Sequence, residues 1–233
     1  MQENTDYNSI RSIAYFIPSM ILIMAIRVGV SAFMVYPGSG IANETLFRAS
    51  GGLPLALQLV EYIISVACFV LLYRLADMNV WIDVSNTMFL CYMLCSVAVR
   101  IVELVAYKLD PAGVAEAAFL TAGEIPLIFI LLGVVFWING IREVYPKILE
   151  KTEVKQKKCT TARRLWILGM SLLIIAELLL EIFILHLNFP VTLPYRILSF
   201  VLAILFLISG IPVTLQTQCF CYSYYLYCYN QGR

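Results

Sequence analysis

The chain has 233 residues, of which 61% are hydrophobic and only 13% are charged. Soluble domains are about half apolar and about a quarter charged. The composition therefore excludes a soluble domain, a nucleic-acid-binding protein and a disordered chain. The net charge of +1 predicts no particular partner, so the positions of the few charged residues carry the information.

Six apolar stretches are long enough to cross a hydrocarbon core as helices, which takes about 20 residues each. These predicted spans cover residues 13–35, 53–75, 87–107, 117–138, 165–187 and 197–215. The pattern predicts an all-α fold, a polytopic integral membrane protein that forms a six-transmembrane-helix bundle over residues 1–216. A Cys- and Tyr-rich tail, residues 217–233, follows the bundle.

The basic residues predict the orientation of the chain. Half of the 16 Lys and Arg lie in residues 142–164, which we expect to be a loop between the fourth and fifth spans. Loops rich in Lys and Arg stay on the cytoplasmic side, so we expect this loop, both termini and the tail to be cytoplasmic. The expected location is a bacterial cytoplasmic membrane. Only three basic residues fall in the predicted outer segments: Arg48, Lys108 and Arg196.

Seven charged residues lie well inside the predicted spans and form the candidate binding site. They are Arg27, Glu61, Arg100, Glu103, Glu124, Glu177 and Glu181. Each would cost about 2.5–3.5 kcal/mol if it faced lipid at the bilayer centre, so these side chains must face one another, backbone groups or water. Counted along the helices, we expect them at mid-depth or in the outer half of the bundle.

The candidate site holds five glutamates and two arginines, so the acids outnumber the bases. Either some carboxylates are protonated, or the cavity is wet and electronegative. This pattern favours a small transporter or ligand-binding protein that takes a cation or a protonatable ligand. The alternative is a non-enzymatic accessory or scaffold subunit, in which the charges form structural ion pairs such as Arg27 with Glu61 and Arg100 with Glu124. No catalytic motif is present, and we expect neither an enzyme nor a cofactor.

The seven cysteines do not form a disulfide framework, and we expect most of them to pack as small apolar residues. Four of them could supply a thiolate metal site, although their spacing matches no standard zinc motif: Cys159, Cys219, Cys221 and Cys228. The simpler interpretation of the tail is an interfacial segment whose aromatic rings lie among lipid headgroups.

The basic loop 142–164 has two candidate partners besides the lipid bilayer that surrounds the spans. It could bind anionic lipid headgroups or an acidic cytosolic protein. Its ordinary role as a determinant of topology needs neither partner, and no nucleic-acid partner is expected.

Two short stretches resemble a bacterial family of multi-span proteins known only as a domain of unknown function. The first is Asn43-Glu44-Thr45-Leu46-Phe47-Arg48, which leads through Gly51 into the second span, and the second is Leu72-Tyr73-Arg74-Leu75 at that span's inner end. The chain departs from the family pattern in its longer basic loop and its Cys- and Tyr-rich tail. The resemblance implies about six spans and transfers no activity or functional residue.

Overall fold

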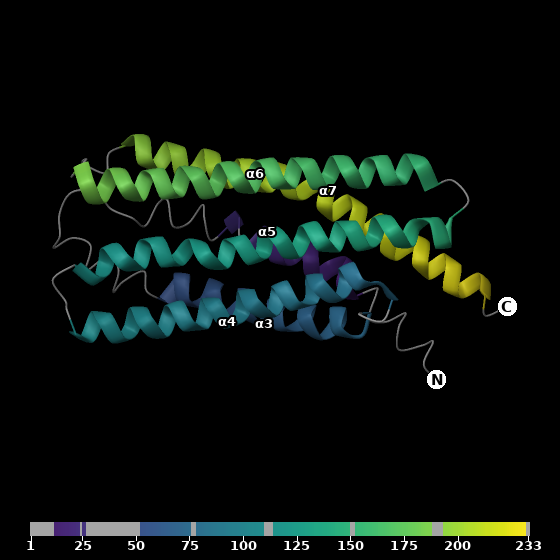
Figure 1. Ribbon diagram of the computed structural model, residues 1–233, viewed down its shortest axis with the longest axis horizontal. Coiled ribbons are helices and arrows are strands. Elements are labelled where there is room, and N and C mark those ends of the chain that lie inside the picture. The colour runs from purple at the N-terminus through teal and green to yellow at the C-terminus, as the bar shows by residue number, and fades with distance from the viewer. Residues whose placement is uncertain are drawn as a thin grey trace.

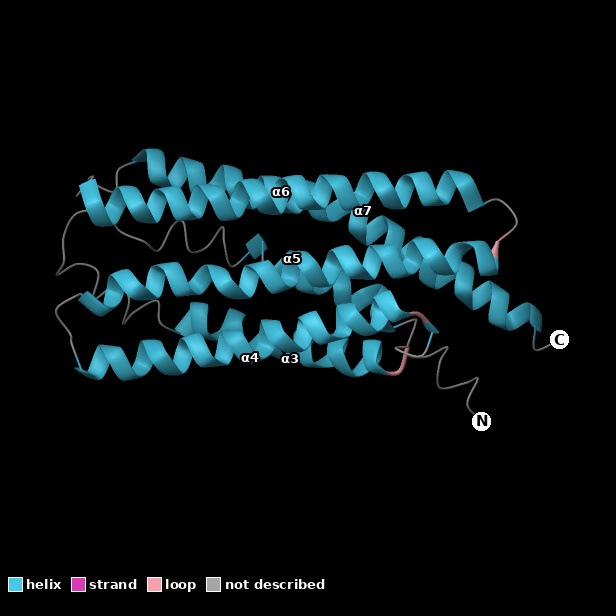
Figure 2. Ribbon diagram, in the orientation of Figure 1, coloured by secondary structure: helices cyan, strands magenta, loops and turns pink. Residues whose placement is uncertain are grey.

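The computed structural model describes residues 12–23, 25–26, 52–75, 78–109, 114–149, 152–187 and 193–231, with side chains over a smaller part of these ranges. Within these residues every regular element is a helix (Figure 2). A first helix covers Ser12–Ile23. The five longer ones are α3 (Gly52–Tyr73), α4 (Val80–Leu109), α5 (Val114–Ile148), α6 (Thr152–Leu187) and α7 (Leu193–Gln231).

The helices form a bundle in which α5 lies between α4 and α6 (Figure 1). Helix α3 packs on α4, and α7 packs on both α6 and α5. The α3–α4 turn, the α5–α6 connection and the end of α7 lie at one end of the bundle. We name this the basic end, because the described ends of its helices carry eight Lys and Arg but three Asp and Glu. The basic residues are Arg74, Arg142, Lys147, Lys155, Lys157, Lys158, Arg163 and Arg164, and the acidic ones are Asp83, Glu143 and Glu153.

Four of the described helices are long and apolar enough to cross a membrane, judged by length and composition. Their apolar windows are Val80–Ala98, Ile125–Ile148, Glu153–Ala176 and Ile204–Asn230. Shorter apolar helical stretches cover Ser12–Ile23 and Tyr62–Tyr73. The predicted all-α helical bundle of a membrane protein is thus confirmed.

Small residues let neighbouring helices approach closely, as is common in membrane bundles. A Cβ atom added at Gly140 of α5 would lie 2.6 Å from Cγ1 of Ile82 in α4. One added at Gly169 of α6 would lie 2.6 Å from Cβ of Ser209 in α7. These two interfaces therefore depend on glycine for their spacing.

The prediction that residues 142–164 form a loop is wrong with respect to the backbone conformation. Helix α5 runs on to Ile148 and α6 begins at Thr152, so almost the whole segment is helical. The segment is helical because one face of it is buried, although the other face is charged. The buried face consists of Val144, Tyr145, Cys159 and Ala162, which lie between the helices. Charged residues such as Lys, Arg and Glu are good helix formers, so the polar face does not oppose the helix.

The predicted division between a transmembrane domain ending at residue 216 and a separate tail also differs from the structure. Helix α7 passes through this point without a break and ends at Gln231. Thr217, Phe220 and Cys221 are buried, and the Phe220 ring meets the Trp137 ring edge-on with centroids 6.0 Å apart. Phe220 therefore packs in the protein core, and its expected place in the headgroup layer is wrong.

The exposed side chains of α6 change from polar to apolar along the helix. Lys157, Thr161 and Arg164 are exposed near the basic end, and Leu165 and Leu168 are exposed directly after them. On α7 the exposed side chains change from Leu215 to Gln218. Because Cys159 of α6 bonds to Gln216 of α7, this change lies about one helical turn nearer to the basic end than the change on α6. Beyond these changes the helices continue toward the basic end as a packed extension, in which Tyr145, Cys159 and Phe220 are buried.

Candidate functional site

The seven charged residues of the predicted site lie largely outside the described part of the chain. Arg27 is outside the described residues, and no side chain of the other six is described. Their helices are described: Glu61 belongs to α3, Arg100 and Glu103 to α4, Glu124 to α5, and Glu177 and Glu181 to α6. The structure therefore gives the positions of these six residues along their helices, and not the contacts of their side chains.

Contacts between described residues set the relative depth of these positions. Helices α4 and α5 are antiparallel, with Phe89 opposite Gly133 and Ile82 opposite Gly140. Continuing that register brings the position of Arg100 on α4 to within about one helical turn, about 5 Å, of the depth of Glu124 on α5. Two helices thus present ionisable residues of opposite sign at nearly one level.

The same counting applies to α5 and α6. The indole of Trp166 in α6 donates a hydrogen bond of 3.3 Å to the carbonyl oxygen of Leu131 in α5, and Arg163 donates one of 2.7 Å to Asn139. Continued along regular helix, this register sets Glu177 within about one turn of the depth of Glu124. Three neighbouring helices therefore carry an ionisable residue at similar depth, far from the basic end.

The described polar contacts gather at the basic end, where a small hydrogen-bonded latch joins α4 to α5. Asn79 precedes α4 and its Oδ1 accepts a bond of 2.7 Å from the backbone N–H of Trp81, the usual N-cap arrangement. Glu143 of α5 accepts bonds from Asn79 Nδ2 at 2.8 Å and from Trp81 Nε1 at 2.5 Å. The Trp81 ring also stacks on Phe136, with centroids 5.7 Å apart.

This latch explains why α4 begins before the predicted span. The sequence assigned residues 76–86 to a loop, whereas α4 starts at Val80. The Asn79 side chain satisfies one of the N–H groups that a helix start leaves without a partner. Asn, followed by an apolar run, was the sequence signal for this start, but the partner residue Glu143 lies 64 positions away and had no such signal.

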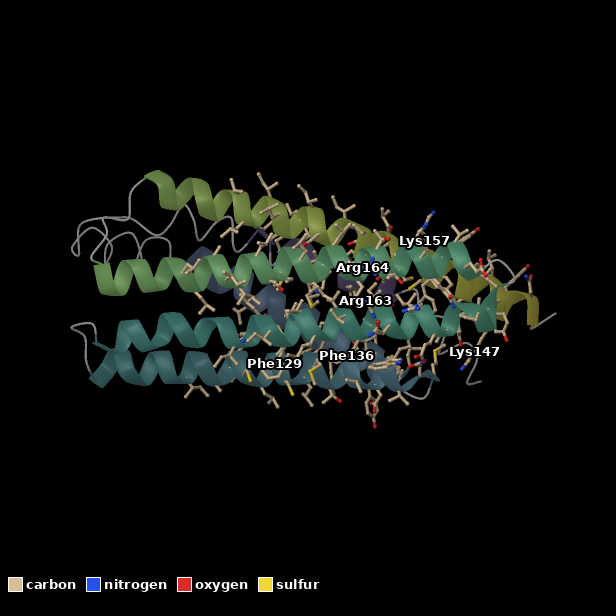
Figure 3. The ribbon with its side chains drawn as sticks, turned by 45° about the horizontal axis from the view of Figure 1, so that its top comes forward. Phe129, Phe136, Lys147, Lys157, Arg163 and Arg164 are labelled. Carbon is tan, nitrogen blue, oxygen red and sulfur yellow. The ribbon has the colours of Figure 1, made fainter. Side chains whose placement is uncertain are left out.

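Arginine and lysine side chains at this end are partly used to hold the helices together. The Arg163 guanidinium bonds to Asn139, and Lys155 Nζ donates a hydrogen bond of 3.3 Å to Ser223 of α7. The same ammonium lies 5.5 Å from the centre of the Tyr145 ring, within the range of a cation–π interaction. Figure 3 shows Lys147 and Lys157 near the α5–α6 connection, with Arg163 and Arg164 further along the bundle.

The four-thiolate metal site is not supported by the geometry. Among the described residues, which include all four cysteines, no group of three or more His, Cys, Asp or Glu side chains could hold a metal ion. Cys219 is exposed whereas Cys221 is buried, because residues two apart on a helix point in nearly opposite directions. Cys159 instead donates its thiol hydrogen to Gln216 Oε1 at 3.5 Å.

Buried polar groups also connect the helices inside the bundle. Trp137 Nε1 donates to Thr217 Oγ1 at 3.0 Å, and Ser85 Oγ donates to the carbonyl oxygen of Gly133 at 2.8 Å. Two buried oxygens on α4, Asn86 Oδ1 and the Tyr92 hydroxyl, have no hydrogen-bond partner in the part of the chain that the structure describes. These contacts fix the register of α4, α5 and α7, and they show no arrangement of a nucleophile with a base.

No protein-family model matches the chain, and no curated protein or solved structure that was compared with it matches either. The resemblance of residues 43–48 and 72–75 to a bacterial multi-span family therefore stays a prediction.

Proposed function

We propose that the protein is a small transporter or ligand-binding protein that takes a cation or a protonatable ligand at an acidic site in the outer half of its bundle. The site would be built from Arg27, Glu61, Arg100, Glu103, Glu124, Glu177 and Glu181. Five acids and two bases leave an excess of negative charge. Intramembrane acids that outnumber their basic partners favour a cation or a proton.

The observation that carries the proposal is the common depth of Arg100, Glu124 and Glu177 on three neighbouring helices. One such residue on an isolated helix could be accommodated by a local water or a long side chain, whereas three at one level on neighbouring helices are what a shared binding site would require. Pro126 lies inside α5, two residues after Glu124, and a proline inside a helix leaves a backbone carbonyl without its usual N–H partner. Such carbonyls are common ligands at midplane sites of transporters.

A second function is favoured by the same register. Arg100 and Glu124 lie at nearly one level on adjacent helices, which is also the arrangement of a structural ion pair. In that case the protein is a non-enzymatic accessory or scaffold membrane subunit, and its basic end is the surface that a cytosolic partner would contact. We further propose a bacterial cytoplasmic membrane with both termini in the cytoplasm, since basic segments favour that side.

The experiment replaces Glu124 or Glu177 with Gln, which keeps the shape and removes the charge. Wild-type protein and variants are reconstituted in liposomes, and the fluxes of Na⁺, Rb⁺ and protons are measured over a range of pH. The proposal predicts a pH-dependent flux in the wild type that both variants lose while they unfold at the same temperature. The matched control is Glu153→Gln, which removes an exposed carboxylate at the basic end and should leave the flux unchanged.

The opposite pattern supports the accessory subunit. If Glu124 is only a structural partner of Arg100, its replacement leaves a buried charge without a partner and costs about 3–5 kcal/mol of stability. The wild type would then pass none of the three ions. A stable wild type without flux, together with an unstable Glu124→Gln variant, contradicts the transport proposal.

A further inference from the structure

Helix α6 presents one exposed face that changes from basic to apolar in a single step. Lys157, Thr161 and Arg164 are exposed at positions i, i+4 and i+7, and Leu168 and Leu172 continue the same line with exposed fractions of 58% and 46%. Residues with this spacing lie on one side of a helix. Neither α5 nor α7 covers this stripe, because all five side chains are exposed in the bundle.

We place the membrane boundary at this step on α6. The basic part spans about 10 Å from Lys157 to Arg164, counted at about 1.5 Å per residue. Figure 3 shows Lys157 and Arg164 on α6, with Lys157 nearer to the basic end. The aliphatic part continues from Arg164 toward the middle of the bundle, where hydrocarbon surrounds the helices.

We propose that this face of α6, residues 157–172, is a binding site for an anionic phospholipid. Arg164 presents a guanidinium fork suited to a phosphate, and Lys157 adds a second positive charge one and a half to two turns further out. The acyl chains lie along Leu168 and Leu172. Basic residues at a membrane surface attract anionic headgroups by about 1 kcal/mol per charge, which is about a five-fold gain in affinity for each.

Continuity between the two parts of the face selects a lipid as the occupant. A cytosolic protein could reach Lys157 but could not cover Leu168 and Leu172 within the hydrocarbon. A lipid has both chemistries in the same order along the membrane normal. The acidic residue on this face within the described part of α6 is Glu153, one turn beyond Lys157 and away from the membrane, so it does not oppose the headgroup at Arg164.

Other basic residues at this end are arranged differently and supply a control. Arg142 and Lys147 are exposed on α5, and Arg163 is already bonded to Asn139. The double variant R142Q/K147Q therefore removes two positive charges, as K157Q/R164Q does, but leaves the proposed site intact. All four side chains are on the surface or near it, and far-ultraviolet circular dichroism checks that both variants fold.

The test titrates detergent-purified protein with phosphatidylglycerol and with phosphatidylcholine of identical chains, and measures the apparent Kd of each. The wild type should prefer phosphatidylglycerol, and K157Q/R164Q should weaken its binding by about 30-fold. The control R142Q/K147Q should weaken it by less than about five-fold. Glycerophosphoglycerol, which has the same phosphodiester charge without the chains, should bind much more weakly than the lipid.

Three outcomes would overturn the proposal. Equal weakening by the two double variants would mean a diffuse attraction to the whole basic end. Equal binding of glycerophosphoglycerol and the lipid would remove the acyl chains from the site. No preference for phosphatidylglycerol over phosphatidylcholine would exclude an anionic lipid as the occupant and leave Lys157 and Arg164 to a cytosolic protein partner.

Discussion

The contact between α6 and α7 at Gly169 allows a prediction with a definite sign. In Gly169→Ala the new Cβ would lie 2.6 Å from both Cβ and Oγ of Ser209, and 3.6 Å from the carbonyl oxygen of Leu205. Carbon atoms in good contact are about 3.5–4.0 Å apart. The two helices would therefore have to separate by about 1 Å at this point, because Ser209 is itself buried and has no room to move away.

Two opposing effects set the size of the change. Overpacking of this kind costs about 1–3 kcal/mol, whereas alanine is about 1 kcal/mol more favourable than glycine inside a helix. The cost exceeds the gain over most of this range, so we expect Gly169→Ala to lower the free energy of unfolding by about 1 kcal/mol. Helix propensity alone would raise it by the same amount, and the two explanations differ in sign.

The second substitution, Ser209→Gly, removes the atoms that the new methyl group would meet. The Ser209 hydroxyl donates to the carbonyl oxygen of Phe206 on its own helix, so its loss breaks no bond between α6 and α7. The double variant G169A/S209G moves the side chain from one helix to the other and should recover most of the lost stability. The coupling energy between the two sites should be about 1–2 kcal/mol.

The assay is unfolding in detergent micelles by titration with sodium dodecyl sulfate, followed by far-ultraviolet circular dichroism on the wild type, the two single variants and the double variant. A Gly169→Ala protein that is more stable than the wild type would refute the close packing. Strictly additive effects in the double variant would refute it as well.

Three further predictions concern the basic end. Asn79→Ala removes the N-cap of α4 and one hydrogen bond to Glu143, and should cost about 1 kcal/mol of unfolding free energy in the same titration. The control Asp83→Asn, on the same helix but outside the latch, should cost much less. Trp137→Phe keeps a ring against Phe220 but leaves the Thr217 hydroxyl without its donor, which should cost about 1–2 kcal/mol of unfolding free energy in the same assay. Adding Thr217→Val should recover part of the lost stability. A membrane-impermeant maleimide should label Cys219, which is exposed, much faster than Cys159 and Cys221, which are buried. Labelling of Cys219 in intact cells, without permeabilisation, would contradict a cytoplasmic C-terminus.

The amino-acid sequence predicts the helical membrane bundle because apolar length alone decides that class. It does not predict how far the helices continue toward the basic end. Residues 142–164 hold half of the Lys and Arg of the chain, which favoured a loop, yet Tyr145 and Cys159 are fully buried. Val213, Thr217 and Phe220, which are buried, recur at the spacing of one helix face, but the aromatic composition of the tail favoured an interfacial segment.

The polar contacts show a second limit of sequence reasoning. Glu143 looked like one more surface charge, and its role depends on Asn79 and Trp81, more than 60 positions away. Pairings of this kind follow from tertiary packing, which the periodicity of a single helix does not contain. The seven intramembrane charges stay a prediction, and their common depth on α4, α5 and α6 is what the register of the described contacts adds.

We infer from the exposed face of α6 that this helix enters the hydrocarbon at Arg164 and that its first three turns lie outside it. The most direct test is spin labelling at Lys157, Thr161, Leu168 and Leu172 in reconstituted protein, with accessibility measured to oxygen and to a water-soluble nickel chelate. Labels at 157 and 161 should be accessible to the nickel complex, and labels at 168 and 172 should be accessible to oxygen. Labels at 157 and 161 that meet oxygen, as those at 168 do, would contradict it.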